Sequence, residues 1–258
     1  ETTPGRAYCG NGRITNQLLA SLPYEMTGAQ RRAIAEITAD QAKPKRMLRM
    51  LQGDGGSGKT LVALWAMLTT MEAGAQAALL APTEVLARQH HASIQAMLAP
   101  LGIEIGLLLG QGRGTGTARE NGTLNGTART LSRKETLTRL ADGSLPLVVG
   151  THALLSETVA FHDLGLAVVD EQHRFGVRQR ILLGEKGAHV DVMVMTATPI
   201  PRSLAMTAYG DLDHSRLDEK PVGRLPIDTR VLPSDRLGDV ISNLGRALGD
   251  GKRAYWIW

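Results

Sequence analysis

The sequence has little of what marks several classes of protein. Among 258 residues there is one cysteine, Cys9, and aromatic residues make up 3% of the chain. A lone cysteine forms no internal disulfide, and no metal-ligating partners stand at ligand spacing around it. No apolar run approaches the roughly 18 residues of a membrane span, and the first residues are too polar for a secretion signal. We therefore expect a cytoplasmic globular protein.

The charge balance is mild. The formal net charge is +4, with 21% charged and 43% hydrophobic residues. This balance permits a polyanionic partner such as nucleic acid but does not identify one. The length predicts one large domain, or one domain together with part of another.

Short apolar runs alternate with longer stretches of helical apolar spacing. Such alternation is typical of an α/β fold in which a mostly parallel sheet carries helices on both faces. Apolar residues at i, i+3 and i+4 predict helices over residues 29–39, 60–71 and 84–98. Runs rich in Val, Leu, Ile and Met predict strands over residues 47–52, 77–81, 103–109, 145–149, 166–169 and 192–195.

Three stretches depart from this alternation. Residues 110–130 are rich in Gly, Thr and Asn, and we interpret them as a mobile surface insertion without chemistry. A loop-like stretch begins at Asp218, a helix is predicted over 237–248, and the final RAYWIW is expected to start another strand. We expect a connecting segment over 1–22, the main domain over 23–223 and the truncated start of a second domain over 224–258.

The first predicted strand leads into GDGGSGKT, residues 53–60, and then into a predicted helix. This is the phosphate-binding pattern G-x-x-x-x-G-K-[ST] in its strand–loop–helix context. Glycines let backbone N–H groups turn toward phosphate oxygens, and the helix N-terminus adds a positive dipole end. Lys59 would reach the β- and γ-phosphates, and the Thr60 hydroxyl would ligate Mg²⁺. The predicted nucleotide-binding residues are Gly53, Gly55, Gly56, Ser57, Gly58, Lys59 and Thr60; the alternative is a glycine-rich turn with an incidental lysine.

A carboxylate for the metal is predicted in LAVVDEQH. Asp170 follows an apolar run, as a Mg²⁺-holding aspartate should, and Glu171 is suited to polarise an attacking water as general base. A solvated acidic pair after a strand is the alternative. With the phosphate loop, this predicts Lys59, Asp170 and Glu171 as catalytic residues, and Thr60 and Asp170 as metal ligands.

Polar residues also follow three other predicted strands. APTE at 81–84, GTH at 150–152 and TATP at 196–199 stand where ligands bind in open α/β sheets, outside the carboxyl ends of the strands. We interpret them as facing a ligand. Each alone is also compatible with a strand-to-helix turn capped by threonine.

Several motifs, taken in chain order, carry a resemblance. LPYEMTGAQ, GDGGSGKT, APTEVLARQH, VVGTHALL, VVDEQHRFGVRQR and MTATPIPRSLAMTAYGDLD resemble the first motor domain of superfamily 2 DNA helicases, most of all the RecG family of branch-migrating helicases. GDLDHSRLDEKPVGR and AYW favour that family over its relative, the transcription-repair coupling factors. The resemblance runs from about residue 22 to the end.

This resemblance implies a RecA-like P-loop domain of an ATP-dependent DNA helicase or translocase. The implied substrate is branched or duplex DNA, with replication fork reversal and Holliday junction branch migration in recombination and repair as the process. ATP and Mg²⁺ are the implied cofactors. The implied location is the bacterial cytoplasm, at the nucleoid.

The resemblance also assigns roles to single residues. Gln30 matches the glutamine that reads adenine, since a side-chain amide can pair with adenine N6 and N7; a surface glutamine on a helix is the alternative. His173, Thr196 and Thr198 match residues that couple the nucleotide state to the grip on DNA, and a core histidine is the alternative for His173. Residues that match segments holding the DNA backbone are Thr83, Glu84, Gln89, Thr151 and His152. Arg202 matches a position that would contact DNA or a second domain.

The sequence departs from the family pattern in two ways. Gly55 stands where the family usually has valine, which should loosen the loop without removing a phosphate contact. Nothing after Arg202 resembles the arginine-finger motif of a second RecA-like domain, and the N-terminal wedge domain is missing. We therefore expect these residues alone to bind Mg²⁺–ATP weakly and not to unwind DNA. A translocase of the transcription-repair coupling factor type and a non-catalytic nucleotide-binding scaffold are the alternative functions.

Overall fold

The computed structural model describes residues 4–110, 131–170, 186–187, 189–198, 212–219 and 229–256. Contacts divide the chain into two compact units, Glu1–Val222 and Gly223–Trp258. Most of the predicted insertion at 110–130 lies outside the described residues.

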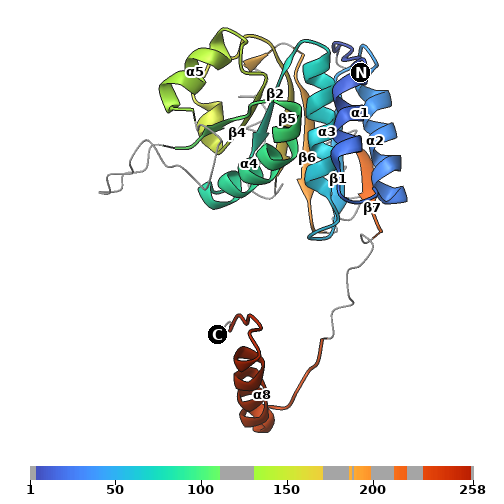
Figure 1. Ribbon diagram of the computed structural model, residues 1–258. Helices are drawn as coiled ribbons and strands as arrows, with labels where there is room; N and C mark the ends of the chain where they lie inside the picture. Colours follow the sequence, from blue (N-terminus) through green and yellow to red (C-terminus); the bar gives the residue numbers. More distant parts are fainter. Residues whose placement is uncertain are drawn as a thin grey trace. The chain divides into compact units, whose positions relative to one another are not determined.

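The first unit is built on a parallel sheet of seven described strands (Figure 1). The strand order is β3-β4-β2-β5-β6-β1-β7, and every described strand pair is parallel. The predicted α/β fold with a parallel sheet is therefore confirmed, although β7 was not predicted. The strands are β1 (Leu48–Gly53), β2 (Gln76–Leu80), β3 (Gly106–Leu108), β4 (Leu147–Gly150), β5 (Leu164–Asp170), β6 (Asp191–Thr196) and β7 (Asp213–Leu217).

Helices lie on both faces of the sheet. Four of them, α1 (Arg13–Ser21), α2 (Gly28–Gln41), α3 (Lys59–Glu72) and α4 (Glu84–Leu98), contribute to one hydrophobic cluster. The opposite face carries α5 (Arg133–Ala141) and the short 3-10 helix η2 (His152–Leu155). A further 3-10 helix, η1 (Ala99–Leu101), follows α4.

Alternation along the strands sorts side chains between these two faces. On β5, Leu166 and Val168 belong to the cluster beneath α1–α4, whereas Ala167 and Val169 belong to the cluster on the opposite face. Because successive side chains of a strand point to opposite faces, the side chain of Asp170 lies on the α1–α4 face.

The N-terminal segment is part of this unit. We expected residues 1–22 to be a connecting segment, but they contain α1, whose Leu18 is fully buried in the main core. The carboxylate of Glu72, at the end of α3, accepts hydrogen bonds from the backbone N–H groups of Gly12 (2.8 Å) and Ile14. The first N–H groups of a helix have no hydrogen-bond partner within the helix. In α1, the side chain of a residue distant in sequence accepts their hydrogen bonds.

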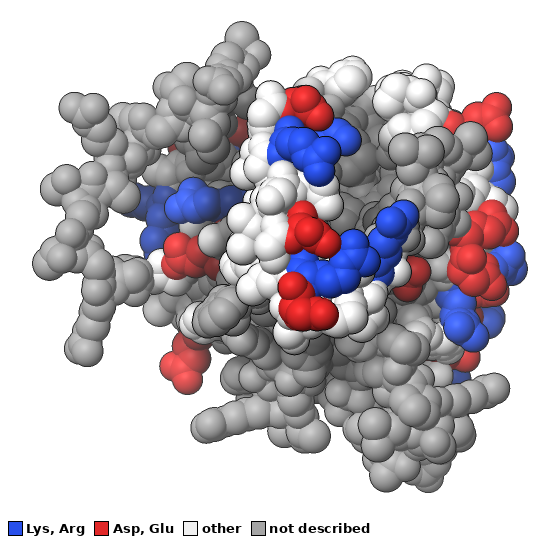
Figure 2. Space-filling model, turned by 90° about the horizontal axis from the view of Figure 1, so that it is seen from below, with Lys and Arg blue, Asp and Glu red and all other residues white. Residues whose placement is uncertain are grey.

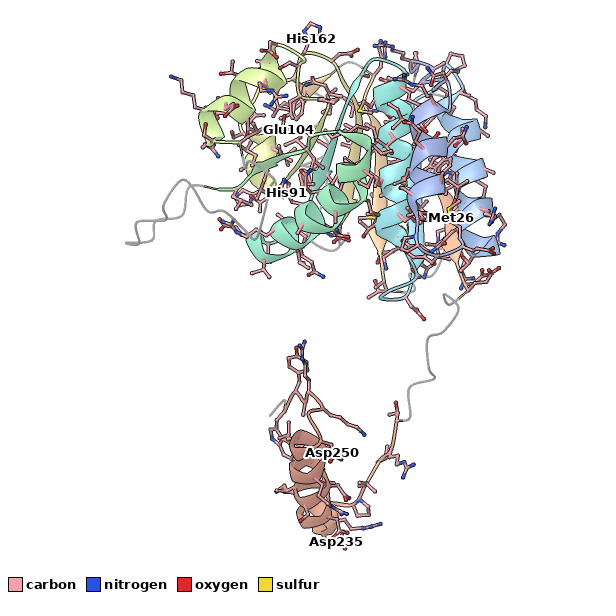
Figure 3. All side chains as sticks on the ribbon, in the orientation of Figure 1. Met26, His91, Glu104, His162, Asp235 and Asp250 are labelled. Atoms are coloured by element: carbon pink, nitrogen blue, oxygen red, sulfur yellow. The ribbon has the colours of Figure 1, made fainter. Side chains whose placement is uncertain are left out.

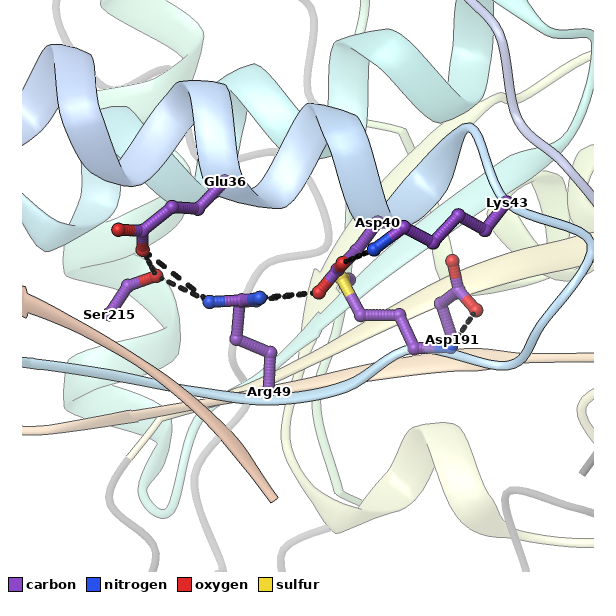
Figure 4. A network of polar contacts seen from close by, with 7 residues as sticks. Glu36, Asp40, Lys43, Arg49, Asp191 and Ser215 are labelled. Atoms are coloured by element: carbon purple, nitrogen blue, oxygen red, sulfur yellow. Dashed lines mark hydrogen bonds and ion pairs between the residues drawn. The ribbon is translucent and has the colours of Figure 1, made fainter. Parts of the chain in front are cut away.

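A polar network fastens β7 to the sheet (Figure 4). The guanidinium of Arg49 on β1 donates to the Ser215 hydroxyl on β7 at 2.8 Å, and it pairs with the carboxylates of Asp40 and Glu36 on α2. The lysine and arginine hydrogen bonds hold the pKa of Asp40 below its usual value against the opposing effect of burial, which is the largest single influence. The edge strand is thus held by side chains as well as by its ladder with β1.

The second unit contains a 3-10 helix, η4 (Ser234–Arg236), and helix α8 (Leu237–Gly249), close to the predicted helix at 237–248. The prediction of a strand at RAYWIW is wrong for the part that the structure describes, since residues 253–256 adopt no strand. An apolar segment becomes a strand only when a neighbouring strand accepts and donates its ladder hydrogen bonds.

Candidate nucleotide site

The carboxyl ends of five strands bring the predicted site residues to one edge of the sheet. Strand register places Asp170 beside Met195, and Met195 beside Leu51, two residues before the phosphate loop. Ligands of open α/β sheets bind at this edge. The ends of β2 and β4 lead into the segments that contain Thr83 and Thr151.

The phosphate loop joins β1 to α3 and depends on glycine at three points. Gly56 and Gly58 have φ angles of +78° and +88°, in the left-handed region that other residues rarely adopt. A Cβ on Gly58 would also lie 2.1 Å from Nε2 of Gln30, and one on Gly53 would lie 2.5 Å from Oγ of Ser57. Gly55 differs, because an added Cβ would meet nothing within 4 Å.

Polar groups of the loop converge on its inner side. The ammonium of Lys59 donates to the backbone carbonyls of Gly53 and of Asp54, the latter at 3.0 Å. Ser57 is buried, and its Oγ has no hydrogen-bond partner in the part of the chain that the structure describes. Thr60 lies in the first turn of α3, beside the helix N-terminus. An ammonium, a hydroxyl and the first N–H groups of a helix fit a phosphate group.

Gln30 lies at the start of α2 and contacts the phosphate loop. Its Oε1 accepts from the backbone N–H of Thr27 at 3.0 Å, while the Thr27 hydroxyl accepts from the Gln30 N–H, which forms a capping box. Its Nε2 donates to the carbonyl of Ser57 at 2.8 Å. Gln30 is 3% exposed, so the alternative of a surface glutamine is wrong. The amide oxygen thus caps α2, while the amide nitrogen connects α2 with the loop.

Asp170 ends β5 and forms a contact that the motifs do not indicate. Its Oδ2 lies 2.6 Å from Nε2 of His90 on α4, and both side chains are largely buried, at 13% and 14% exposed. No sequence signal pairs these two residues, because they lie 80 positions apart. His90 is the last residue of APTEVLARQH, a segment that the motifs matched to DNA holding and not to the metal site.

A second unpredicted residue, Gln52 on β1, contacts β7 and the segment that follows β6, next to the phosphate loop. Its Oε1 lies 2.8 Å from Nε2 of His214 on β7, and its Nε2 donates to the Thr198 carbonyl at 3.4 Å. Thr196, at the end of β6, contacts Thr198 through their hydroxyls at 3.0 Å. The TAT segment is therefore joined to the strand that precedes the loop.

The residues matched to DNA-holding segments fall into two groups. Thr83 and Thr151 use their hydroxyls as helix caps, accepting from the Leu86 N–H at 3.3 Å and the Ala153 N–H at 3.5 Å. The capped-turn interpretation therefore describes these two hydroxyls, although Thr83 stays exposed while Thr151 is buried. The remaining matches, Glu84, Gln89 and His152, are all exposed.

Three predicted site residues lie outside the described part of the chain: Glu171, His173 and Arg202. Among the described residues, no three His, Cys, Asp or Glu side chains form a group that could hold a metal ion. Mg²⁺ in nucleotide sites is usually held by one or two protein groups together with phosphate oxygens, so Thr60 and Asp170 remain a compatible pair. No helix in the described residues is long and apolar enough to cross a membrane.

This fold and loop define a class. A parallel sheet in which one strand leads through a glycine-rich loop into a helix, with an aspartate ending the next strand but one, is the arrangement of a RecA-like P-loop nucleotide-binding domain. Within that class, the family model described as DEAD/DEAH box helicase matches residues 27–207. The chain belongs to the DEAD/DEAH box helicase family, and the resemblance to helicases drawn from the motifs is confirmed.

The most similar proteins include several bacterial helicases. The chain is 49% identical over 246 residues to the ATP-dependent DNA helicase RecG of Acidithiobacillus ferridurans, covering 95% of this chain and 34% of that protein. It is 47% identical over 252 residues to RecG of Escherichia coli (strain K12), covering 96% of this chain and 34% of that protein. The chain thus spans about a third of the length of these relatives.

Solved structures agree on the fold. A structure of RecG bound to a three-way DNA junction matches with a TM-score of 0.80 and 37% identity, over 99% of this chain and 32% of that one. The DEAD-box helicase Mss116, bound to single-stranded RNA and UDP-BeF, matches with a TM-score of 0.64 over 92% of this chain and 51% of that one. At 16% identity, the second likeness concerns the fold alone.

Proposed function

We propose that the chain contains the first motor domain of an ATP-dependent DNA helicase or translocase that acts on branched DNA. The observation that carries this proposal is the phosphate loop, whose lysine, buried serine hydroxyl and glycine-dependent backbone stand at the same sheet edge as Asp170. The relatives named RecG, and the solved RecG–junction complex, support branched DNA as the substrate.

Within this proposal, ATP is held by the loop and Mg²⁺ by Thr60 and Asp170. Lys59 binds the β- and γ-phosphates, and Gln30, whose amide already contacts the loop, reads adenine. When bound, Mg²⁺ neutralises charge on the phosphate oxygens. Glu171 polarises the attacking water, while Thr196, Thr198 and His173 transmit the nucleotide state.

DNA is the proposed macromolecular partner, contacted along the carboxyl edge. The sites proposed for the DNA backbone are Thr83, Glu84, Gln89, Thr151 and His152, and Arg202 is proposed to contact DNA or the second domain. The surface charge does not carry this part of the proposal: in Figure 2, Lys and Arg side chains are interspersed with Asp and Glu side chains on the coloured surface. Short polar groups and N–H donors can hold phosphates without a strongly basic surface.

The activity of the whole protein requires more than this chain. We propose that residues 224–258 begin a second RecA-like domain, which would close on the nucleotide and supply an arginine finger. Such an arginine contributes about 10³- to 10⁵-fold in rate in P-loop enzymes. The 258-residue chain alone should therefore bind Mg²⁺–ATP weakly and hydrolyse it slowly. We place the whole protein in the bacterial cytoplasm, at the nucleoid.

Replacing Lys59 by alanine in the complete protein tests the proposed function. We expect loss of the contacts to the β- and γ-phosphates, and therefore loss of DNA-stimulated ATP hydrolysis and of fork reversal, with the fold intact by circular dichroism. Lys43→Ala, which removes an exposed lysine paired with Asp40, is the matched control and should leave both activities unchanged. Full activity of Lys59→Ala would indicate a nucleotide-independent scaffold instead.

A further inference from the structure

The contact between His90 and Asp170 is not explained by the motifs. The two atoms, Nε2 of His90 and Oδ2 of Asp170, lie 2.6 Å apart, and both side chains are largely buried. A carboxylate offers only acceptors, so the imidazole Nε2 carries the hydrogen and donates it. A charge-assisted hydrogen bond of this length, in a site shielded from water, fixes the orientation of the carboxyl group.

Helix α4 presents His90 from a fixed position. Ala87, Ile94 and Leu98 are fully buried in the cluster on this face of the sheet, and Thr83 caps the first turn. The alternation along β5 places the side chain of Asp170 on the same face. Neither partner therefore has to leave its packed element to form the contact.

The next residue along the helix, His91, which is labelled in Figure 3, makes a different contact. Its Nε2 lies 3.1 Å from the Ile105 carbonyl, in the segment before β3. Burial lowers the pKa of His91, which favours a neutral ring in a packing role. The two adjacent histidines thus differ in what they contact.

We propose that His90 is a positioning residue for the metal-binding carboxylate, which it orients toward the phosphate loop through the hydrogen bond to Oδ2. This inference rests on the proposed function, in which Asp170 holds Mg²⁺. With Oδ2 engaged by His90, Oδ1 is the oxygen left for the metal or for a water bound to it. Groups that orient metal-ligating side chains typically change metal affinity 10- to 100-fold when they are removed.

The same contact links the proposed metal site with the proposed DNA contacts. Glu84 and His90 belong to one helix and are separated by about 9 Å along its axis, at 1.5 Å per residue. Thr83 and Glu84 are proposed DNA contacts. A displacement of α4 on binding DNA would therefore reach Asp170 through His90, without passing through the phosphate loop.

The test measures binding of a fluorescent, non-hydrolysable ATP analogue to the full chain while Mg²⁺ is titrated. For His90→Ala we expect the Mg²⁺ concentration for half-maximal enhancement of binding to rise about tenfold or more, with the Mg²⁺-free affinity unchanged. His90→Gln, whose amide nitrogen can take the place of Nε2, should recover most of the effect. His90→Asn, whose side chain is too short to reach Asp170, should not recover the effect. The comparison of these two variants tests the inference even if the alanine variant fails to fold.

His91→Gln is the matched control and should titrate like the unmodified chain. A His90→Ala variant with unaltered Mg²⁺ dependence would overturn the inference, as would a His90→Gln variant no better than His90→Asn. If the unmodified chain itself shows no Mg²⁺-dependent binding, the proposed function fails, and the inference fails with it. Mg²⁺-dependent binding by the unmodified chain therefore distinguishes failure of the inference from failure of the proposed function.

Discussion

Two glycines of the phosphate loop perform different tasks, and only Gly58 stands at a position where the motif requires glycine. Gly58 has a φ of +88° and no room for a Cβ beside Gln30, whereas Gly55 has an ordinary φ and open space around it. The open space agrees with the interpretation that Gly55 takes the place of a larger family residue. The backbone of Gly55 is conformationally free, and this freedom is lost, at a cost in entropy, when the loop orders around a ligand.

We expect the two alanine variants of these glycines to have opposite effects. Gly58→Ala should destabilise the chain by about 1–2 kcal/mol from the left-handed backbone alone, and the clash with Gln30 should weaken nucleotide binding further. Gly55→Ala should leave stability unchanged or raise it by about 0.4–1 kcal/mol, since it restricts the unfolded chain. Urea unfolding and titration with the ATP analogue measure both effects. Equal damage from the two substitutions would contradict this account of the loop.

The sequence also shows which site residues can be found by pattern and which cannot. Lys59 and Asp170 were predicted because their spacing and their place after apolar runs follow from the chemistry of phosphate and metal binding. His90 and Gln52 were not found, because their partners lie on strands distant in the sequence. A single polar residue near the end of a strand or inside a helix gives no local indication of such a contact.

At the scale of elements, burial decided what could be predicted. Strands β1 to β6 are buried on both faces, so each appears as an apolar run. Strand β7 has the sequence DHSRL, in which only Ser215 and Leu217 are buried, and it therefore resembles a loop. Helix α1 was not predicted because its cap is a tertiary contact from Glu72 and not a local sequence motif. Helix α5 was not predicted because its sequence is mostly polar.

The attachment of β7 should depend on Arg49. In Arg49→Met the arginine stem is replaced by an apolar chain of similar length, while Asp40 and Ser215 lose their buried partner. Breaking a buried ion pair by removing one member costs about 3–5 kcal/mol, and part of that cost falls on the edge strand. Hydrogen exchange should show lost protection of the β7 amides, with β5 protected as before.

Arg139→Met is the control for this experiment. Arg139 pairs with Glu104 at 2.6 Å, but their side chains are 27% and 40% exposed. Exposed pairs contribute about 0–1 kcal/mol, so this variant should leave exchange across the sheet unchanged. Uniform loss of protection in Arg49→Met, at β5 as much as at β7, would mean that the network supports the whole unit and not the edge strand.

At the scale of the whole molecule, a buried carboxyl group at the opposite end of the sheet from the site sets a pH dependence of stability. Asp191, at the start of β6, is fully buried; its Oδ1 accepts from the Met47 N–H at 2.7 Å, and its Oδ2 has no partner among the described residues. Burial raises the pKa of Asp191 to about 7, against the smaller opposing effects of the Met47 hydrogen bond and Arg46.

The sign of the effect follows from proton uptake. Between pH 4 and pH 7 the folded chain keeps a proton on Asp191 that the unfolded chain has released, so the free energy of unfolding falls as the pH rises through this range. The full loss is roughly 4 kcal/mol, from about 1.4 kcal/mol for each unit of pKa difference. His91 acts in the opposite direction below pH 6.5, because burial lowers its pKa.

Asp191→Asn isolates the contribution of the carboxyl group, since His91 is the same in both proteins. The amide keeps an acceptor for the Met47 N–H but carries no charge at any pH. We expect urea unfolding at pH 5 and pH 8 to show a smaller loss of stability in the variant than in the unmodified chain. Asp163→Asn, which removes an exposed partner of Arg6, should lose as much stability between pH 5 and pH 8 as the unmodified chain. If Asp191→Asn loses as much stability between the two pH values as the unmodified chain, the carboxyl group is already ionised when folded, and burial in the sheet has not shifted its pKa.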